Sequence, residues 1–145
     1  MALKVELKPG ERIILGECVI TNDDQRTRLY IEGDAPILRE KDILTPKTAN
    51  TPAKRVYLAI QLMYLSSTEV DDFSSYFTLV QDMIRAAPST LPFIDRMNNL
   101  ILTSSYYKAL KEAKALIAYE QELLAYAKHG GTGVREDSGQ DRKSA

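Results

Sequence analysis

The sequence predicts an α+β fold: a small antiparallel sheet or partly open barrel of four or five strands, followed by a bundle of three or four helices. Two observations predict it. Apolar residues recur with period two from Ala2 to about Leu44, and the period becomes helical after residue 51. We therefore expect a strand-rich module over 1–48, a helical module over 49–128 and a disordered tail over 129–145, which is polar and rich in Gly and Ser.

The strand-rich module is divided by turn-forming residues. The stretch "LKPGERIILGECVI" (7–20) contains a Pro9-Gly10 pair between apolar alternations and a second reversal at Gly16-Glu17. We expect the Pro9-Gly10 turn to close a first hairpin, and further turns to fall at 22–25 and 32–36. Tight turns of this kind favour an antiparallel meander or a small open barrel. The alternating apolar positions are Leu3, Val5, Leu7, Ile13, Leu15, Val19, Leu29 and Ile31.

The first helix has a clear start signal. Thr51 is a good N-cap, and Pro52 fits the first helical position because the N–H it lacks would be unsatisfied there. The following residues are apolar on two faces of a helix, so we expect burial on both sides.

Three further helical segments follow. We expect the second to start near Ser67 or Thr68, with acidic residues in its first turn, and to end at "AAPST" (86–90). The third runs from Leu91 to about Leu102, and a long helix continues after a bend at "TSS" (103–105) to a Gly stop. The expected apolar stripe of the second helix is Phe73, Phe77, Val80 and Ile84.

The long last helix has an apolar stripe with a spacing of roughly 3.5 residues. Packing within the chain is the default interpretation of so short a pattern. The alternative is a surface for a partner helix or a second copy of the chain. For that alternative, the candidate partner-binding residues are Leu116, Tyr119, Leu123 and Tyr126.

Residues for bond-breaking chemistry are scarce. The chain has one histidine, His129, and one cysteine, Cys18, which we expect to be a small buried or half-buried hydrophobe. Acidic pairs at 23–24 and 71–72 fit a turn and a helix start better than a metal or catalytic site. No phosphate-binding loop or hydrolase motif occurs. We therefore expect no enzyme activity, no metal and no cofactor.

The lack of targeting segments and the balance of charges limit where the protein acts and what it binds. The sequence has neither an export signal nor an apolar run of about 20 residues, so we expect a cytoplasmic protein without a membrane anchor. Its 19 basic and 20 acidic residues nearly cancel, and a nucleic acid would have to bind a local patch. Arg26 and Arg28 share one strand face, as do Lys4 and Lys8. Such cations could bind single-stranded RNA, although composition alone favours a solvated polar face.

Three segments in order resemble the FlbT family of flagellar post-transcriptional regulators: "LKPGERIILGECVI", "APILREKDIL" (35–44) and "TPAKRVYLAIQLMYL" (51–65). The resemblance covers roughly residues 3 to 125. It implies a regulator that acts on the 5′ untranslated leader of flagellin mRNA and changes the message's stability or translation, as a repressor or an activator. It also implies a small partner of the FlaF family, for which the helical module offers a docking surface.

The opening "KPGERIILG" is also similar to the first hairpin of the carbon storage regulator proteins, which are RNA-binding translational repressors. This chain departs from them by adding a long helical region. For a FlbT-like protein we expect RNA contacts from three groups of basic residues and from Lys54 and Arg55, whose place at a helix start is electrostatically unfavourable. The three groups are Lys8 with Arg12, Arg26 with Arg28, and Arg39 with Lys41, the last of which an ion-pair ladder with Glu40 and Asp42 would also explain.

Two functions remain open. The first is an RNA-associated regulator, and the second is an adaptor or chaperone-like factor of flagellar assembly that binds a protein through its helices and never touches RNA. Exposed strand edges and the last helix also make a homo-oligomer plausible.

Overall fold

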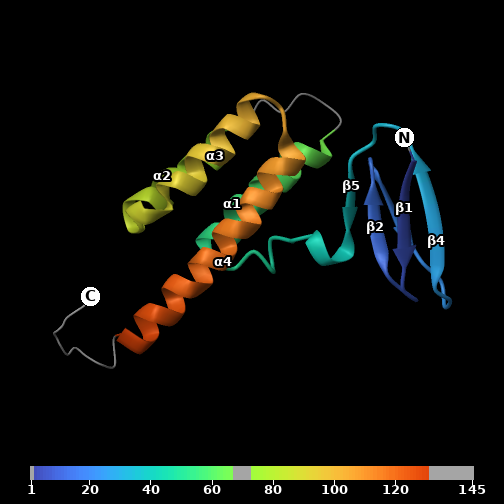
Figure 1. Cartoon of the computed structure of the whole chain (residues 1–145), viewed down its shortest axis with the longest axis horizontal. Helices are drawn as coiled ribbons and strands as arrows, with labels where there is room; N and C mark the ends of the chain where they lie inside the picture. The colour runs from blue at the N-terminus through green and yellow to red at the C-terminus, as the bar shows by residue number, and fades with distance from the viewer. Residues whose placement is uncertain (1, 67–72, 131–145) are drawn as a thin grey trace.

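A computed structural model describes residues 2–66 and 73–130. Figure 1 shows the strands gathered at one end of the molecule and the helices at the other, with the C-terminal part of α4 extending away from the strands. This arrangement confirms the predicted α+β class. The elements are β1 (Ala2–Leu7), β2 (Arg12–Leu15), β3 (Cys18–Thr21), β4 (Thr27–Glu32), β5 (Ile37–Arg39), the 3₁₀ turn η1 (Glu40–Asp42), α1 (Pro52–Leu65), α2 (Ser74–Ala86), η2 (Pro88–Thr90), α3 (Leu91–Leu102) and α4 (Tyr106–Gly130).

The strands form two small antiparallel sheets. One pairs β1 with β4, and the other has the order β3-β2-β5. Alternation places Val5, Leu7 and Ile13 inward, where they are buried against apolar side chains contributed by all five strands. The two sheets therefore share one apolar core without closing into a barrel.

The predicted hairpin at Pro9-Gly10 is wrong, because β1 pairs with β4 and not with β2. The two-residue Gly16-Glu17 loop does close the β2–β3 hairpin, and Leu15 faces Cys18 across it. Backbone hydrogen bonds extend that hairpin back to Gly10, whose N–H donates to the Asp23 carbonyl at 2.9 Å. Gly10 has φ of 74°, a conformation that favours glycine. The Pro-Gly turn thus carries the chain from one sheet to the other.

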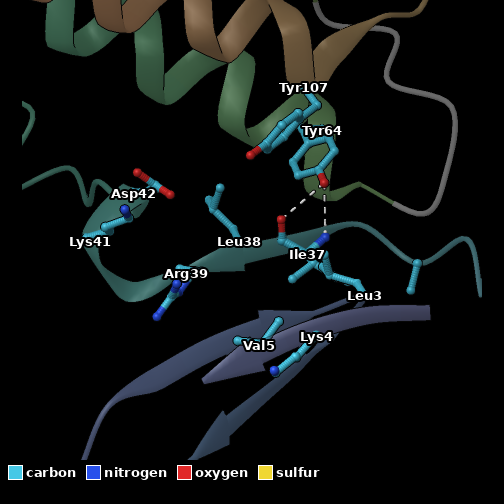
Figure 2. A pocket seen from close by; sticks show the side chains of 11 residues that line it. Leu3, Lys4, Val5, Ile37, Leu38, Arg39, Lys41, Asp42, Tyr64 and Tyr107 are labelled. Atoms are coloured by element: carbon cyan, nitrogen blue, oxygen red, sulfur yellow. Dashed lines mark hydrogen bonds between the residues drawn. The ribbon is translucent and has the colours of Figure 1, made fainter. Parts of the chain in front are cut away.

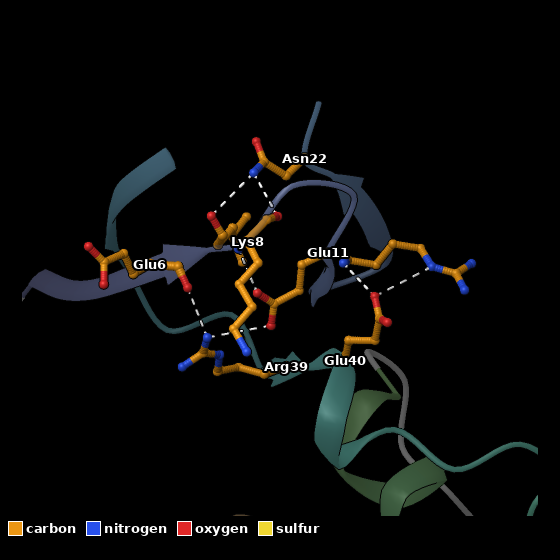
Figure 3. Close-up of polar contacts among 8 residues, drawn as sticks. Glu6, Lys8, Glu11, Asn22, Arg39 and Glu40 are labelled. Atoms are coloured by element: carbon orange, nitrogen blue, oxygen red, sulfur yellow. Dashed lines mark hydrogen bonds and ion pairs between the residues drawn. The ribbon is translucent and has the colours of Figure 1, made fainter. Parts of the chain in front are cut away.

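Asn22 holds this crossing in place. Its side-chain amide donates to the carbonyl oxygens of Lys8 at 2.8 Å, Gln25 at 2.8 Å and Leu7 at 3.2 Å. Figure 3 shows the amide between the end of β1 and the turn. One side chain therefore links the exit of β1 to the segment that leads into β4.

Local signals correctly predict the start of α1. The hydroxyl of Thr51 accepts a hydrogen bond from the Lys54 N–H at 3.2 Å, and Pro52 occupies the first turn. Helix α3 begins at Leu91, as expected, and the bend at 103–105 separates it from α4.

The predicted second helix needs correction. Helix α2 begins at Ser74, and the expected start near Ser67 or Thr68 lies outside the described residues. Its buried positions are Tyr76, Val80 and Met83, whereas Phe77 is 48% exposed. In the predicted stripe, Val80 is buried and Phe73 and Ile84 pack partly buried against the core, so only Phe77 was placed wrongly. Tyr76, a tyrosine with a paired hydroxyl, is buried in the core instead. That hydroxyl donates to Asn98 at 2.6 Å.

Helix α1 joins the two halves through a column of three side chains. The Tyr57 hydroxyl donates to the Asp42 carbonyl at 2.6 Å, and the Tyr64 hydroxyl bonds the N–H and the C=O of Ile37 at 3.0 and 3.1 Å. Between them, Gln61 accepts from the Leu44 N–H and donates to its C=O, both at 2.9 Å. Spacing of four and three residues puts the column on one helix face. It fixes the segment from β5 onward against α1.

Replacement of Gln61 by Ala should lower the free energy of unfolding by about 1–3 kcal/mol, since it leaves the backbone of Leu44 unpaired in a part-buried place. Urea denaturation followed by circular dichroism measures the change. Gln81→Ala, at an exposed position of α2, is the matched control and should stay within about 0.5 kcal/mol of the original chain. Equal midpoints for the two variants would show that the column does not stabilise the fold.

Candidate nucleic-acid interface

The predicted RNA-contact residues around the Pro9-Gly10 turn lie in a polar network (Figure 3). The Arg12 backbone N–H donates to Glu40 Oε1 at 2.7 Å, and its guanidinium Nε lies 3.8 Å from the same oxygen. Glu11 accepts from the Lys8 N–H at 2.8 Å and pairs with Arg39 Nη2 at 3.4 Å. The Lys8 N–H, and with it the charge of Arg39, lowers the pKa of the Glu11 carboxyl. These contacts tie the turn to β5 and η1.

The same network sorts the predicted cations into paired and unpaired ones. Arg28 pairs with Glu6 at 3.6 Å, so three of the arginines have carboxylate partners. The ion pairs differ from the expected ladder, because Glu40 pairs with Arg12 and Asp42 pairs with Lys114. Within residues 2–66 and 73–128, no ion pair is formed by Lys8, Arg26, Lys41, Lys54 or Arg55.

The start of α1, where Lys54 and Arg55 sit, is stabilised by an acid from a distant helix. Glu120 of α4 is only 5% exposed, and its Oε2 accepts a hydrogen bond from the Ala53 N–H at 2.9 Å. A carboxylate beside the positive end of a helix is favourable. Sequence reasoning missed this partner because 67 residues separate it from Ala53.

A groove of about 420 Å³ lies between the sheets and the helices (Figure 2). One wall is formed by Lys4 on β1, and Arg39 with Lys41 continues the lining along β5 and η1. The opposite wall presents the rings of Tyr64 and Tyr107, which Figure 2 shows next to each other above β5. A smaller hollow continues along α4 to Lys111 and Lys114 and shares Leu38, Asp42 and Tyr107 with the groove.

The aromatic wall combines a fixed ring and an accessible one. The centroids of Tyr64 and Tyr107 lie 5.7 Å apart, and Tyr107 is 46% exposed. Lys111 Nζ lies 5.2 Å from the Tyr107 centroid, within cation–π range. Burial raises the pKa of the Tyr64 hydroxyl, whose hydrogen bonds to Ile37 hold the ring in place.

The groove brings together only two of the predicted RNA contacts, Arg39 and Lys41. Lys8, Arg12, Arg26, Arg28, Lys54 and Arg55 are outside its lining. The tyrosine of α4 was missed because only the tertiary packing of α4 against α1 places it beside β5. Its signal in the sequence is an aromatic and a lysine four residues apart, Tyr107 and Lys111, which is weak when read alone.

The predicted partner surface on α4 also needs correction. Leu116 is 0% exposed and packs in the helical core, so its expected exposure is wrong. Tyr119 is half-buried, with its hydroxyl donating to Ser89 at 2.6 Å and its ring 5.0 Å from Phe93. Leu123 is half-buried, and Tyr126 is 78% exposed. The accessible part of the predicted surface is therefore the C-terminal end of α4.

The exposure of Cys18 and the end of α4 both differ from the predictions. Cys18 is exposed, and the expectation of a buried or half-buried side chain is wrong: the residue begins the edge strand β3, directly after the Gly16-Glu17 loop. Within the described residues, no group of three potential ligands could hold a metal ion. No helix in that part of the chain combines the length and apolar composition needed to cross a membrane. Helix α4 reaches Gly130, two residues into the predicted tail, whose residues 131–145 lie outside the described structure.

The sequence of this chain is similar to those of known flagellar proteins. The family model described as flagellar protein FlbT matches residues 3–124. A probable flagellum biosynthesis repressor protein FlbT 1 of Bradyrhizobium diazoefficiens is 61% identical over 124 residues, which is 85% of either chain. A Rhodopseudomonas palustris relative described as a probable flagellum biosynthesis repressor protein FlbT is 52% identical, covering 86% of this chain and 99% of its own. The flagellum biosynthesis repressor protein FlbT of Caulobacter vibrioides is 35% identical, covering 90% and 94%. No solved structure matches. With its family match across nearly all the described residues and with these relatives, the chain belongs to the FlbT family of flagellar proteins.

Proposed function

We propose that this protein regulates flagellin synthesis after transcription, in the cytoplasm, by binding the 5′ untranslated leader of flagellin mRNA and changing the message's stability or translation. Membership of the FlbT family carries the proposal, since relatives across most of the chain are described as flagellum biosynthesis repressors. No cofactor or bond-breaking step is needed for this activity.

The surface charges support direct contact with RNA. Lys8, Arg26 and Lys41 are exposed and form no ion pair with any described residue, so their charge is available to phosphates. Arg55 is exposed as well, next to the half-buried Lys54. Arg12, Arg28 and Arg39 would contact RNA only if each exchanged its present carboxylate partner for a phosphate of the RNA.

A second candidate function is that of a protein adaptor of flagellar assembly. The observation that favours it is the end of α4, where Leu124 is 54% and Tyr126 is 78% exposed beside the half-buried Leu123. Exposed aromatic and aliphatic side chains are typical of interface anchors. A FlaF-like regulator is the partner we propose for this surface, with a second copy of the chain as the competing occupant.

Titration of the purified protein with a labelled flagellin leader separates the two functions. Direct binding predicts an affinity that falls as salt rises, with a slope of about 0.7 per phosphate contact on single strands. Replacing Lys8 and Arg26 by Gln should lower both the affinity and the slope, whereas Leu123→Glu should weaken only binding of a FlaF-like partner. A folded protein that fails to bind the leader at low salt would exclude direct contact and leave the adaptor.

A further inference from the structure

We propose that the groove between β1, β5 and α4 binds a single-stranded segment of RNA, with a base stacked on Tyr107 and phosphates held by Lys4 and Lys41 in the groove and by Lys111 in the adjoining hollow. This inference rests on the proposed RNA-binding function and assigns it a site. The groove was not predicted as a unit, because its lining combines residues of β1, β5, α1 and α4, which are far apart in the chain.

The aromatic wall is suited to stacking. Nearly half of the Tyr107 surface is open, and its neighbour Tyr64 is immobilised through the backbone of Ile37. A base that stacks on an aromatic ring gains affinity with little dependence on its identity. A tyrosine already held beside a second ring loses little freedom on binding.

The charge of the groove complements a phosphate backbone. Lys4, Lys41 and Lys111 are exposed, and none of them pairs with a carboxylate within the described residues. The acid that lines the groove, Asp42, is occupied by Lys114. The unpaired charge that remains in the groove is therefore positive. It suits the phosphates of an RNA strand better than it suits an acidic protein segment.

The geometry favours an unpaired strand over a duplex. A groove of about 420 Å³ is comparable in size to sites for small ligands, which are roughly 300–1,000 Å³. A base can reach the ring of Tyr107 only when it is unstacked from its neighbours, as in loops and single strands. Tyr57, Gln61 and Tyr64 fix the two walls relative to each other, so the groove exists before any ligand arrives.

The test compares two substitutions at one position, using a flagellin leader transcript and the full chain. Tyr107→Ala removes the ring and should weaken binding by about 5- to 150-fold, while Tyr107→Phe keeps the ring and should bind like the original. Phe77→Ala is the matched control, because Phe77 is equally exposed, at 48%, on α2 and does not line the groove. It should leave the affinity unchanged.

A second readout does not depend on the affinity. An oligonucleotide carrying 2-aminopurine, whose fluorescence is quenched by stacking, should be quenched by the original chain and by Tyr107→Phe but not by Tyr107→Ala. The pair Lys41→Gln and Lys111→Gln should lower the salt slope by about 1.4 in total, whereas Lys128→Gln, near the end of α4, should not change it.

The outcomes distinguish failure of the site from failure of the function. If the original chain does not bind the leader, the proposed function fails. If it binds and Tyr107→Ala binds equally well with no loss of quenching, RNA binds elsewhere and this inference is overturned. If Tyr107→Ala keeps RNA affinity but loses a FlaF-like partner, the groove is a protein site, and the inference is likewise overturned.

Discussion

Leu116→Glu is expected to unfold the helical half of the protein. The side chain is 0% exposed, and α4 carries it into the core cluster that all four helices share. Burying an unpaired carboxylate costs several kcal/mol, and the lost apolar contact adds about 1.5–3 kcal/mol. The sum is comparable with the whole stability of a domain, about 5–15 kcal/mol. Loss of the cooperative thermal transition in circular dichroism is therefore the expected result.

Tyr126→Glu provides the comparison on the same helix. Tyr126 is 78% exposed, so the charge stays in water and the unfolding midpoint should hardly move. This contrast matters for any test of partner binding. A regulatory defect in Leu116→Glu would report unfolding, whereas one in Tyr126→Glu would report a lost contact. A Leu116→Glu protein with an unchanged transition would contradict the packing of α4.

The position of Leu116 illustrates what a single sequence can predict. The apolar spacing correctly predicted a long amphipathic helix, and packing within the chain was the default interpretation of its stripe. Which end of the stripe stays exposed depends on how far the neighbouring helices extend, and periodicity carries no such information. The cap at Thr51 was predicted correctly, because its chemistry is local. The acid at the same helix end, Glu120, was missed because its contact is not local.

In the sheets, too, local features were predicted correctly and non-local contacts were not. The two-residue turn at Gly16-Glu17 was predicted from its own residues and closes a hairpin. The Pro9-Gly10 pair has equally good turn chemistry, yet the strands on either side of it belong to different sheets. Strand pairing depends on which apolar faces meet, so a turn signal fixes the reversal of the chain but not the partner of the strand. The groove was also missed, because it depends on which strands and helices pack side by side, and local turn or helix signals do not predict that packing.

Leu38→Ala should lower the free energy of unfolding by about 2–5 kcal/mol. Leu38 lies on β5, opposite Ile14 of β2, but its side chain is 2% exposed within the core cluster of the helices. It therefore connects the two halves through packing, in addition to the hydrogen bonds from α1. Urea denaturation measures the loss, and Leu102→Ala, at a side chain that is 80% exposed, should stay within about 0.5 kcal/mol.

The same substitution should also weaken leader binding without removing any charge. Leu38 lines the groove, and loosening β5 against α4 separates the wall that carries Lys4 from the wall that carries Tyr107. An RNA strand that contacts both walls then has to order the two walls when it binds, and this cost lowers the apparent affinity for RNA. The decrease should be largest in the presence of mild denaturant and absent for Leu102→Ala. If Leu38→Ala loses stability but binds RNA like the original chain at every denaturant concentration, then RNA does not need both walls, and the contacts belong to one half of the protein alone.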